Sequence, residues 1–136
     1  MEGLEGLTIG IFTETYKPQV NGVVASIENL KQILTQKGCR LVIFTVGEES
    51  GVQTEDSCII HRFKSVNLPS YPEYRVTLPR FHKIKNLVRR YGLEILHSHG
   101  PFSMGLNALY AHRALGISLV GTFHTLLPEY LHYLVG

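Results

Sequence analysis

Several features that define common protein classes are scarce or missing in this sequence. Its 136 residues include only two cysteines, and its formal net charge is +2. Cys39 and Cys58 have no CxxC or other metal-binding spacing, so we expect buried free thiols of a reduced cytoplasm. No apolar run approaches the roughly 20 residues needed to span a bilayer. The small net charge does not indicate nucleic acid as a partner.

Catalytic and nucleotide-binding motifs are missing as well. The sequence has no GxGxxG, no GxxxxGK[ST] and no GxSxG, which argues against classical dinucleotide binding, a P-loop and a nucleophile elbow. Glu14 and Glu129 are the only carboxylates at plausible sheet edges, so a glycosidase carboxylate pair is not evident. The first residues lack the basic region of a secretory signal. We therefore expect a protein of the cytoplasm or of the cytoplasmic membrane face.

Apolar runs alternate with helical patterns along the chain. The composition, 44% hydrophobic and 18% charged, is that of one globular domain. The runs predict strands over 7–13, 40–46, 58–63, 94–99 and 118–124. The helical spacing predicts a four-turn helix from Val23, capped by Asn21 and ended by Gly38, and helices over 78–91, 102–115 and 126–135, whereas 64–77 are typical of an irregular connection. This order predicts an α/β fold with a doubly wound, Rossmann-like parallel sheet.

Ligands of such sheets bind beyond the carboxyl ends of the strands. Asn21 and Gly22 stand there at a helix N-terminus, which suits a phosphate or a sugar oxygen, although Asn-Gly is also a common turn with an N-cap. His97 and His99 should share one face of their strand, and His124 ends the next strand. Three histidines could hold zinc. No cysteine or carboxylate ends a matching strand, so hydrogen bonds to a polyhydroxylated ligand fit better than a metal.

The helix over residues 78–91 carries cations without acids. Its apolar stripe includes Phe81 and Tyr91, and its cations are Arg80, Lys83, Lys85, Arg89 and Arg90. One interpretation is a solvated face over a stripe that packs on the core. The other is a surface that docks on anionic lipid.

Three segments carry a family resemblance. Residues 9–23 (IGIFTETYKPQVNGV) resemble the opening of family-four retaining glycosyltransferases of the GT-B fold. Residues 97–105 (HSHGPFSMG) and 121–125 (GTFHT) resemble the strand-four and strand-five motifs of that family. Residues 128–133 (PEYLHY) are most similar to members that glycosylate diacylglycerol or related lipids.

The resemblance implies roles for particular residues. A nucleotide sugar would be the donor, with retention at the anomeric carbon, no cofactor and no obligatory metal. Asn21 and Gly22 would lie against the donor, and His124 would be the catalytic residue that contacts the transferred sugar. The acceptor pocket would include Tyr16, His99, Thr125 and Glu129.

The resemblance also implies a domain organisation. Residues 1–136 would form the N-terminal, acceptor-side domain, and the C-terminal donor-binding domain would be absent from this chain, which alone should not turn over. The expected partners are a nucleotide sugar, a lipid or saccharide acceptor, the C-terminal domain and an anionic membrane surface, but no nucleic acid. A stand-alone sugar- or nucleotide-binding module is an alternative. A flavodoxin-like regulatory domain is another, although it lacks a phosphate loop after the first strand.

Overall fold

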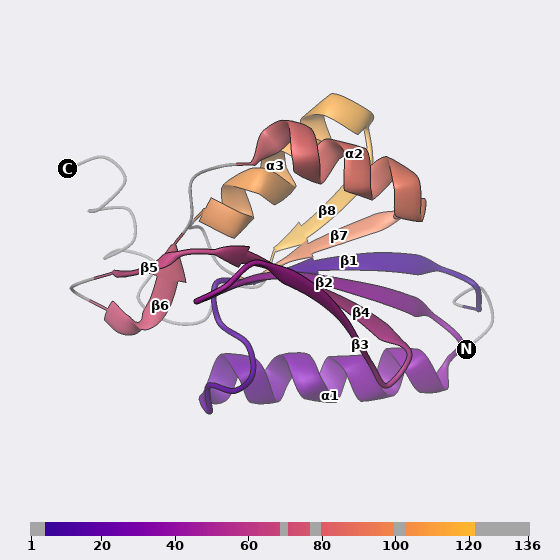
Figure 1. Cartoon of the computed structure of the whole chain (residues 1–136). Helices are drawn as coiled ribbons and strands as arrows, with labels where there is room; N and C mark the ends of the chain where they lie inside the picture. The colour runs from indigo at the N-terminus through magenta and orange to yellow at the C-terminus, as the bar shows by residue number, and fades with distance from the viewer. Residues whose placement is uncertain (1–4, 69–70, 77–79, 100–102, 122–136) are drawn as a thin grey trace.

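A six-stranded sheet with helices on both faces forms the part of the chain that the structure describes. The computed structural model describes residues 5–68, 71–76, 80–99 and 103–121. Helix α1 (Gly22–Gln36) covers one face, and α2 (Phe81–Tyr91) and α3 (Ser103–Leu115) cover the other (Figure 1). The strands are β1 (Thr8–Phe12), β2 (Arg40–Gly47), β3 (Gly51–Glu55), β4 (Cys58–Lys64), β7 (Ile95–Ser98) and β8 (Ser118–Gly121).

The order of the strands is β3-β4-β2-β1-β7-β8. Every neighbouring pair is parallel except β3 and β4, which are antiparallel. The parallel strands coincide with the five predicted runs, although β8 is described only as far as Gly121. Starting at β1, the chain builds outward to β2 and β4, then crosses back to β7 and β8, which is the doubly wound arrangement. The predicted Rossmann-like α/β fold is confirmed.

Two strand regions differ from the prediction. β3 was not expected, because its first four residues are exposed and their pattern carries no apolar signal. It joins β4 through Asp56 and Ser57, whose φ values of 51° and 65° are those of a tight hairpin turn.

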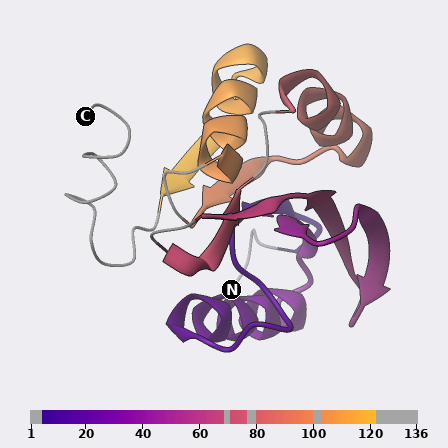
Figure 2. The same cartoon turned by 60° about the vertical axis from the view of Figure 1, so that its left-hand side comes forward.

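The prediction of an irregular connection over 64–77 is also wrong in part. β5 (Val66–Leu68) and β6 (Tyr71–Val76) pair with each other in a separate antiparallel ribbon. Pro72 disfavours a strand inside a sheet, yet a two-stranded ribbon consists of edges, where proline is tolerated. The ribbon lies beyond the end of the main sheet near the loop between β1 and α1, as the two views show (Figures 1 and 2).

The sheet separates two apolar cores. Ile11, Ile43 and Ile60 face α1 and are fully buried with Ile27 of that helix. The alternate residues face α2 and α3, where Phe12 and Phe44 stack at 4.7 Å in one cluster with Ile84, Val88, Met104 and Ala108. Burial of each of these Ile, Val, Phe and Met side chains contributes about 1.5–3 kcal/mol. Cys39 and Cys58 are buried on the α1 side and are not joined in a disulfide, as expected.

The ends of α1 follow the predicted signals. The Asn21 side chain accepts a hydrogen bond from the Val24 amide at 3.0 Å, which confirms the N-cap. Gly38 follows the last turn with a φ of 84°, a backbone conformation that glycine adopts without strain. Among the residues that the structure describes, no helix is long and apolar enough to cross a bilayer.

Candidate functional site

Polar segments meet at the carboxyl edge of the sheet. The ladder continues past the strand ends, because Thr13 donates its amide hydrogen bond to the Phe44 carbonyl at 3.0 Å and His99 donates to the Phe12 carbonyl at 2.9 Å. Parallel strands therefore bring the β1–α1 loop, residues 13–21, beside His99. This loop is called the first loop below.

Side chains of the first loop hold its own backbone. The Thr13 hydroxyl donates to the Thr15 carbonyl at 2.8 Å, and the side-chain amide of Asn21 donates to the Thr15 hydroxyl at 2.9 Å. The Thr15 hydroxyl in turn donates to the Gln19 side chain, and the backbone amide of Gln19 donates to the Tyr16 carbonyl at 3.1 Å. Asn21 therefore closes the loop with its nitrogen and caps α1 with its oxygen.

The N-terminus of α1 is open to a ligand. Gly22 is exposed, and a Cβ added to it would meet no atom within 4 Å. A ligand can therefore approach this backbone closely, and the first turn of a helix presents N–H groups and a positive dipole end. The geometry fits the donor role predicted for Asn21 and Gly22, which stays a prediction.

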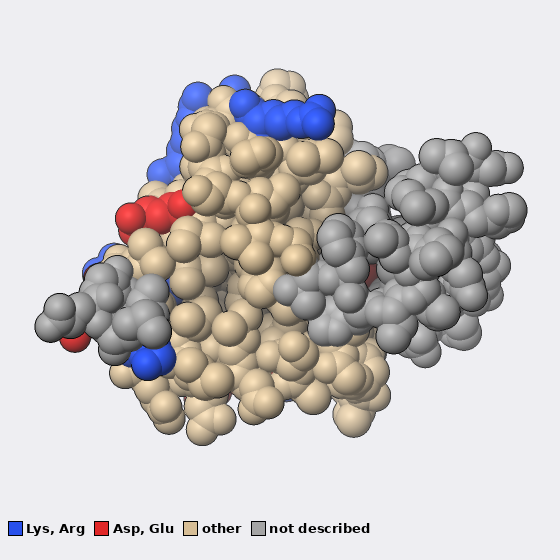
Figure 3. Space-filling model, turned by 180° about the vertical axis from the view of Figure 1, so that it is seen from behind, with Lys and Arg blue, Asp and Glu red and all other residues tan. Residues whose placement is uncertain are grey.

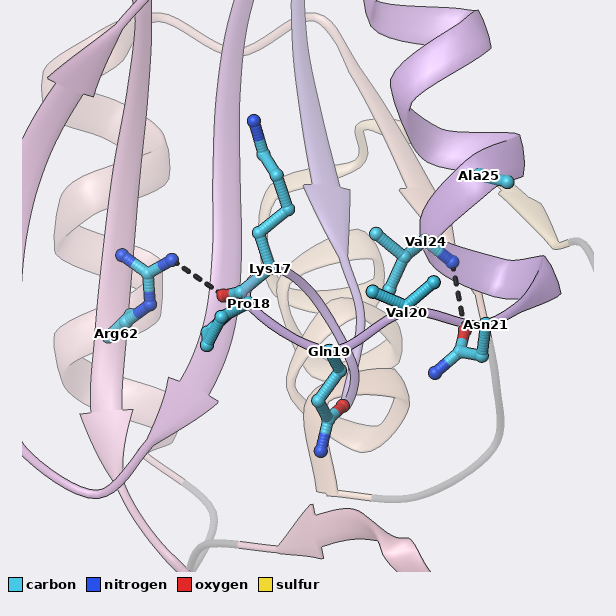
Figure 4. Close-up of a pocket in the computed structure, with 8 residues that line it drawn as sticks. All are labelled: Lys17, Pro18, Gln19, Val20, Asn21, Val24, Ala25 and Arg62. Carbon is cyan, nitrogen blue, oxygen red and sulfur yellow. Dashed lines mark hydrogen bonds between the residues drawn. The ribbon is translucent and has the colours of Figure 1, made fainter.

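Two hollows flank the first loop. One has a volume of about 550 Å³ and lies between the loop, the start of α1 and Arg62 of β4, whose guanidinium donates to the Lys17 carbonyl at 2.9 Å (Figure 4). Its walls are formed by Lys17, Pro18, Gln19, Val20, Asn21, Val24, Ala25 and Arg62. The other, of about 600 Å³, reaches Glu14 and the residues that follow β2. Residues 17–21 of the loop thus border open space.

Glu14 joins the first loop to α3. This residue is only 3% exposed, and its carboxylate accepts a hydrogen bond at 2.6 Å from the amide of Met104, in the first turn of α3. A carboxylate is stabilised at the positive end of a helix. The sequence marked Glu14 as an edge carboxylate but missed this contact, because the two residues lie 90 positions apart. One amide of the first turn of α3 is thus paired within the chain.

His97 of β7 and His99, directly after that strand, lie together, as their spacing predicted. The rings of His97 and His99 have centroids 4.2 Å apart, and His99 is 5% exposed. His124, Thr125 and Glu129 lie outside the described residues, so the expected gathering of three histidines stays a prediction. Over the described ranges, no three His, Cys, Asp or Glu side chains are placed to hold a metal ion.

Tyr16 is buried in this structure. Its side chain is 3% exposed, packs in the core on the α1 side, and donates its hydroxyl to Glu28 at 2.8 Å. Burial raises the pKa of this phenol above its usual range, and the Glu28 carboxylate raises it further. These contacts are those of a packing residue, and the acceptor role assigned to Tyr16 stays a prediction.

The apolar stripe of α2 packs on the protein. Phe81 stacks on Tyr110 of α3 with centroids 4.6 Å apart, and the Tyr91 hydroxyl lies 2.7 Å from Nε2 of His61. Both rings are half-buried against other side chains of the protein, so this stripe packs on the core, and membrane docking through α2 stays a prediction. The cations face outward: Arg80, Lys83, Arg89 and Arg90 are exposed and Lys85 is half-buried. Seen from behind, Lys and Arg side chains gather over the α2–α3 end (Figure 3).

The fold and the polar segments at the carboxyl edge of the sheet define an α/β domain. Domains of this class bind ligands beyond the carboxyl ends of their parallel strands. Residues 20–136 match the profile of Glycosyltransferase Family 4, and the chain belongs to this family.

Similar proteins cover nearly the whole chain. It is 37% identical over 128 residues to an alpha-monoglucosyldiacylglycerol synthase of Streptococcus pneumoniae, an alignment that covers 94% of the chain and 29% of that protein. The synthase of the same name from Acholeplasma laidlawii is 31% identical, with 93% and 32% covered. A GDP-mannose-dependent alpha-mannosyltransferase of Mycobacterium tuberculosis is 26% identical, with 92% and 34% covered. The chain spans about three tenths of the length of these relatives.

Proposed function

We propose that this chain is the N-terminal, acceptor-side domain of a glycosyltransferase that moves a hexose from a nucleotide sugar to a hydroxyl group of an acceptor. The observation that carries the proposal is the open, capped N-terminus of α1 at the carboxyl edge of a Family 4 domain. The second, donor-binding domain would follow in the complete protein. Together the two domains would exclude water and orient the reactants.

The donor diphosphate fits the start of α1. Asn21 holds the cap, and Gly22 lets a phosphate oxygen approach the backbone. In the reaction, the acceptor oxygen bonds to the anomeric carbon while the bond to the diphosphate breaks, and the proton of the acceptor hydroxyl passes to the departing diphosphate. Negative charge then develops on the leaving group and needs preorganised hydrogen-bond donors. We assign most of these donors to the second domain, with no obligatory metal or cofactor.

His124 would orient the transferred sugar through a hydrogen bond to one of its hydroxyl groups, and His99, Thr125 and Glu129 would contribute to the acceptor pocket. The names of these relatives specify alpha-linked products. Common nucleotide hexoses are themselves α-linked, so an α-linked product would mean retention of configuration.

A lipid acceptor is the more specific part of the proposal. Two relatives are named as diacylglycerol glycoside synthases. The exposed cations of α2 would hold the protein against the anionic lipids of the cytoplasmic membrane face.

The test uses the protein expressed from its complete gene. It is incubated with radiolabelled UDP-hexoses or GDP-mannose and with diacylglycerol in mixed micelles, and the anomeric configuration of the product is read by NMR. We expect an α-linked glycolipid. Micromolar binding of a nucleotide sugar by residues 1–136 in calorimetry, without transfer by the complete protein, would instead indicate a binding module.

A further inference from the structure

Five charged side chains join the first loop to α1 and to the β3–β4 hairpin. The ammonium of Lys17 lies 2.6 Å from Oε1 of Glu28 on α1 and is also paired with Glu55 at the end of β3. The ammonium of Lys31 lies 3.3 Å from Glu28 and 3.2 Å from Glu55, with Asp56 at 3.5 Å. Two cations thus share the same acids across three segments of the chain.

Lys17 differs from Lys31 because it is bound at both ends. Its ammonium is held by the two acids, and its main-chain carbonyl accepts the hydrogen bond from Arg62 at 2.9 Å. Lys31 projects from the middle of α1, so its backbone is already fixed by the helix. Of the two lysines, only Lys17 belongs to the first loop, and it joins the acids to the loop backbone beside the Tyr16 hydroxyl, which also binds Glu28 at 2.8 Å.

Charge keeps this arrangement in place near neutral pH. Glu28 and Glu55 raise the pKa of Lys17, and Lys17 is the main cause that lowers the pKa of Glu55. The Lys17 side chain is 37% exposed, so its ion pairs add little to global stability. The arrangement determines where the loop lies more than whether the domain folds.

The segment after Lys17 depends on such anchors. Val20 is 97% exposed and Pro18 is also exposed, so little apolar packing holds this part of the loop. Asn21 fixes its far end through the cap of α1 and the bond to Thr15. The near end is fixed at Lys17.

We infer that Lys17 is a positioning residue, which holds residues 18–21 in the conformation that presents the start of α1 to the donor diphosphate. This inference rests on the proposed function for the ligand, but the anchoring itself can be measured without any reaction. Lys17 touches no reacting atom in this account. It acts through the loop backbone and Asn21.

The first experiment compares hydrogen exchange in residues 1–136 for the wild type, Lys17→Met and Glu55→Gln. The amides of residues 19–24 should exchange about tenfold faster in Lys17→Met, because one anchor is lost and local opening becomes easier. Glu55→Gln should shift the same amides in the same direction, and strands β2 and β7 should not change. Lys37→Met, at the other end of α1, is the matched control. Unchanged exchange in residues 19–24 would overturn the inference.

The second experiment measures kinetics in the complete protein. Lys17→Met should raise the KM for the nucleotide sugar about tenfold, with the acceptor KM within about twofold, while Lys17→Arg should restore most of the loss. Faster loop exchange with an unchanged donor KM would also overturn the positioning role. A complete wild-type protein that transfers no sugar would contradict the proposed function, whereas the exchange comparison would still decide whether Lys17 anchors the loop.

Discussion

Nε2 of His61 on β4 lies 2.7 Å from the hydroxyl of Tyr91, the last residue of α2. The imidazole is 6% exposed and stacks on Phe44 with ring centroids 5.5 Å apart. Burial lowers the pKa of His61, and the cations Lys83 and Arg90 lower it further. The contact therefore joins α2 to the sheet through a histidine whose neutral form is favoured in the folded state.

Stability should depend on this histidine in mildly acidic solution. The unfolded chain binds the proton at a pKa of 6.5, above that of the folded state. The contribution of neutral His61 to the free energy of unfolding is therefore complete above about pH 7. It decreases as the pH falls through 6.5 toward the lower pKa of the folded state. Urea unfolding between about pH 8 and 5 should show this decrease in the wild type and a flatter profile in His61→Gln. The exposed His82, changed to Gln, is the control, and identical slopes for all three proteins would refute the assignment.

Loss of the Glu14 carboxylate should weaken the start of α3. Glu14→Ala removes the acceptor 2.6 Å from the Met104 amide and should lower the free energy of unfolding by about 1–2 kcal/mol, as for other lost caps. Glu14→Gln keeps an oxygen acceptor and should lose less. Glu49→Ala, at an exposed position after β2, provides the comparison in urea unfolding. Equal stability of the two alanine variants would show that the contact is not needed.

Substitutions of Asn21 can separate capping from donor binding. Asn21→Ala should lower stability by about 1 kcal/mol, whereas Asn21→Asp should lose less, because aspartate caps helices as well as asparagine does although it cannot donate to the Thr15 hydroxyl. The new carboxylate would nevertheless repel the donor diphosphate and raise the donor KM of the complete protein about tenfold or more. Thermal unfolding and initial rates measure the two effects. A stable Asn21→Asp enzyme with a normal donor KM would place the diphosphate elsewhere.

Removal of three cations from α2 should weaken binding to anionic vesicles. Each cation near such a surface contributes about 1 kcal/mol, so Lys83→Gln/Lys85→Gln/Arg89→Gln should bind on the order of a hundredfold less tightly. High salt should reduce the difference. Co-sedimentation of the complete protein with anionic and neutral vesicles measures it.

The matched control for this membrane experiment removes the same charge away from α2, in Lys37→Gln/Arg40→Gln/Lys64→Gln. If the α2 triple variant sediments like the wild type on anionic vesicles, the cations only form a solvent-exposed face. A soluble acceptor would then be favoured.

His124→Ala should lower kcat of the complete protein by about 10²-fold or more, a loss typical of a removed catalytic contact. Circular dichroism should show an unchanged fold. Near-normal turnover would end the assignment of His124 to the transferred sugar.

The parallel strands, the helices between them and both ends of α1 could be predicted because their signals are local. Branched apolar runs mark strands that are covered on both faces, and Asn21 and Gly38 act on backbone groups within a few residues of themselves. The spacing of His97 and His99 likewise placed their rings together, since alternate residues of a strand share a face.

Only the tertiary structure determined which polar groups pair over long separations. Lys17 and Glu55 are 38 positions apart, His61 and Tyr91 are 30 apart, and Glu14 and Met104 are 90 apart. Strand β3 was missed for a related reason, because an exposed edge strand is stabilised by pairing with β4 rather than by burial of its own side chains. Periodicity shows which face of an element is buried. The packing of distant elements decides what the remaining polar groups contact, because each of those contacts depends on where the other elements lie.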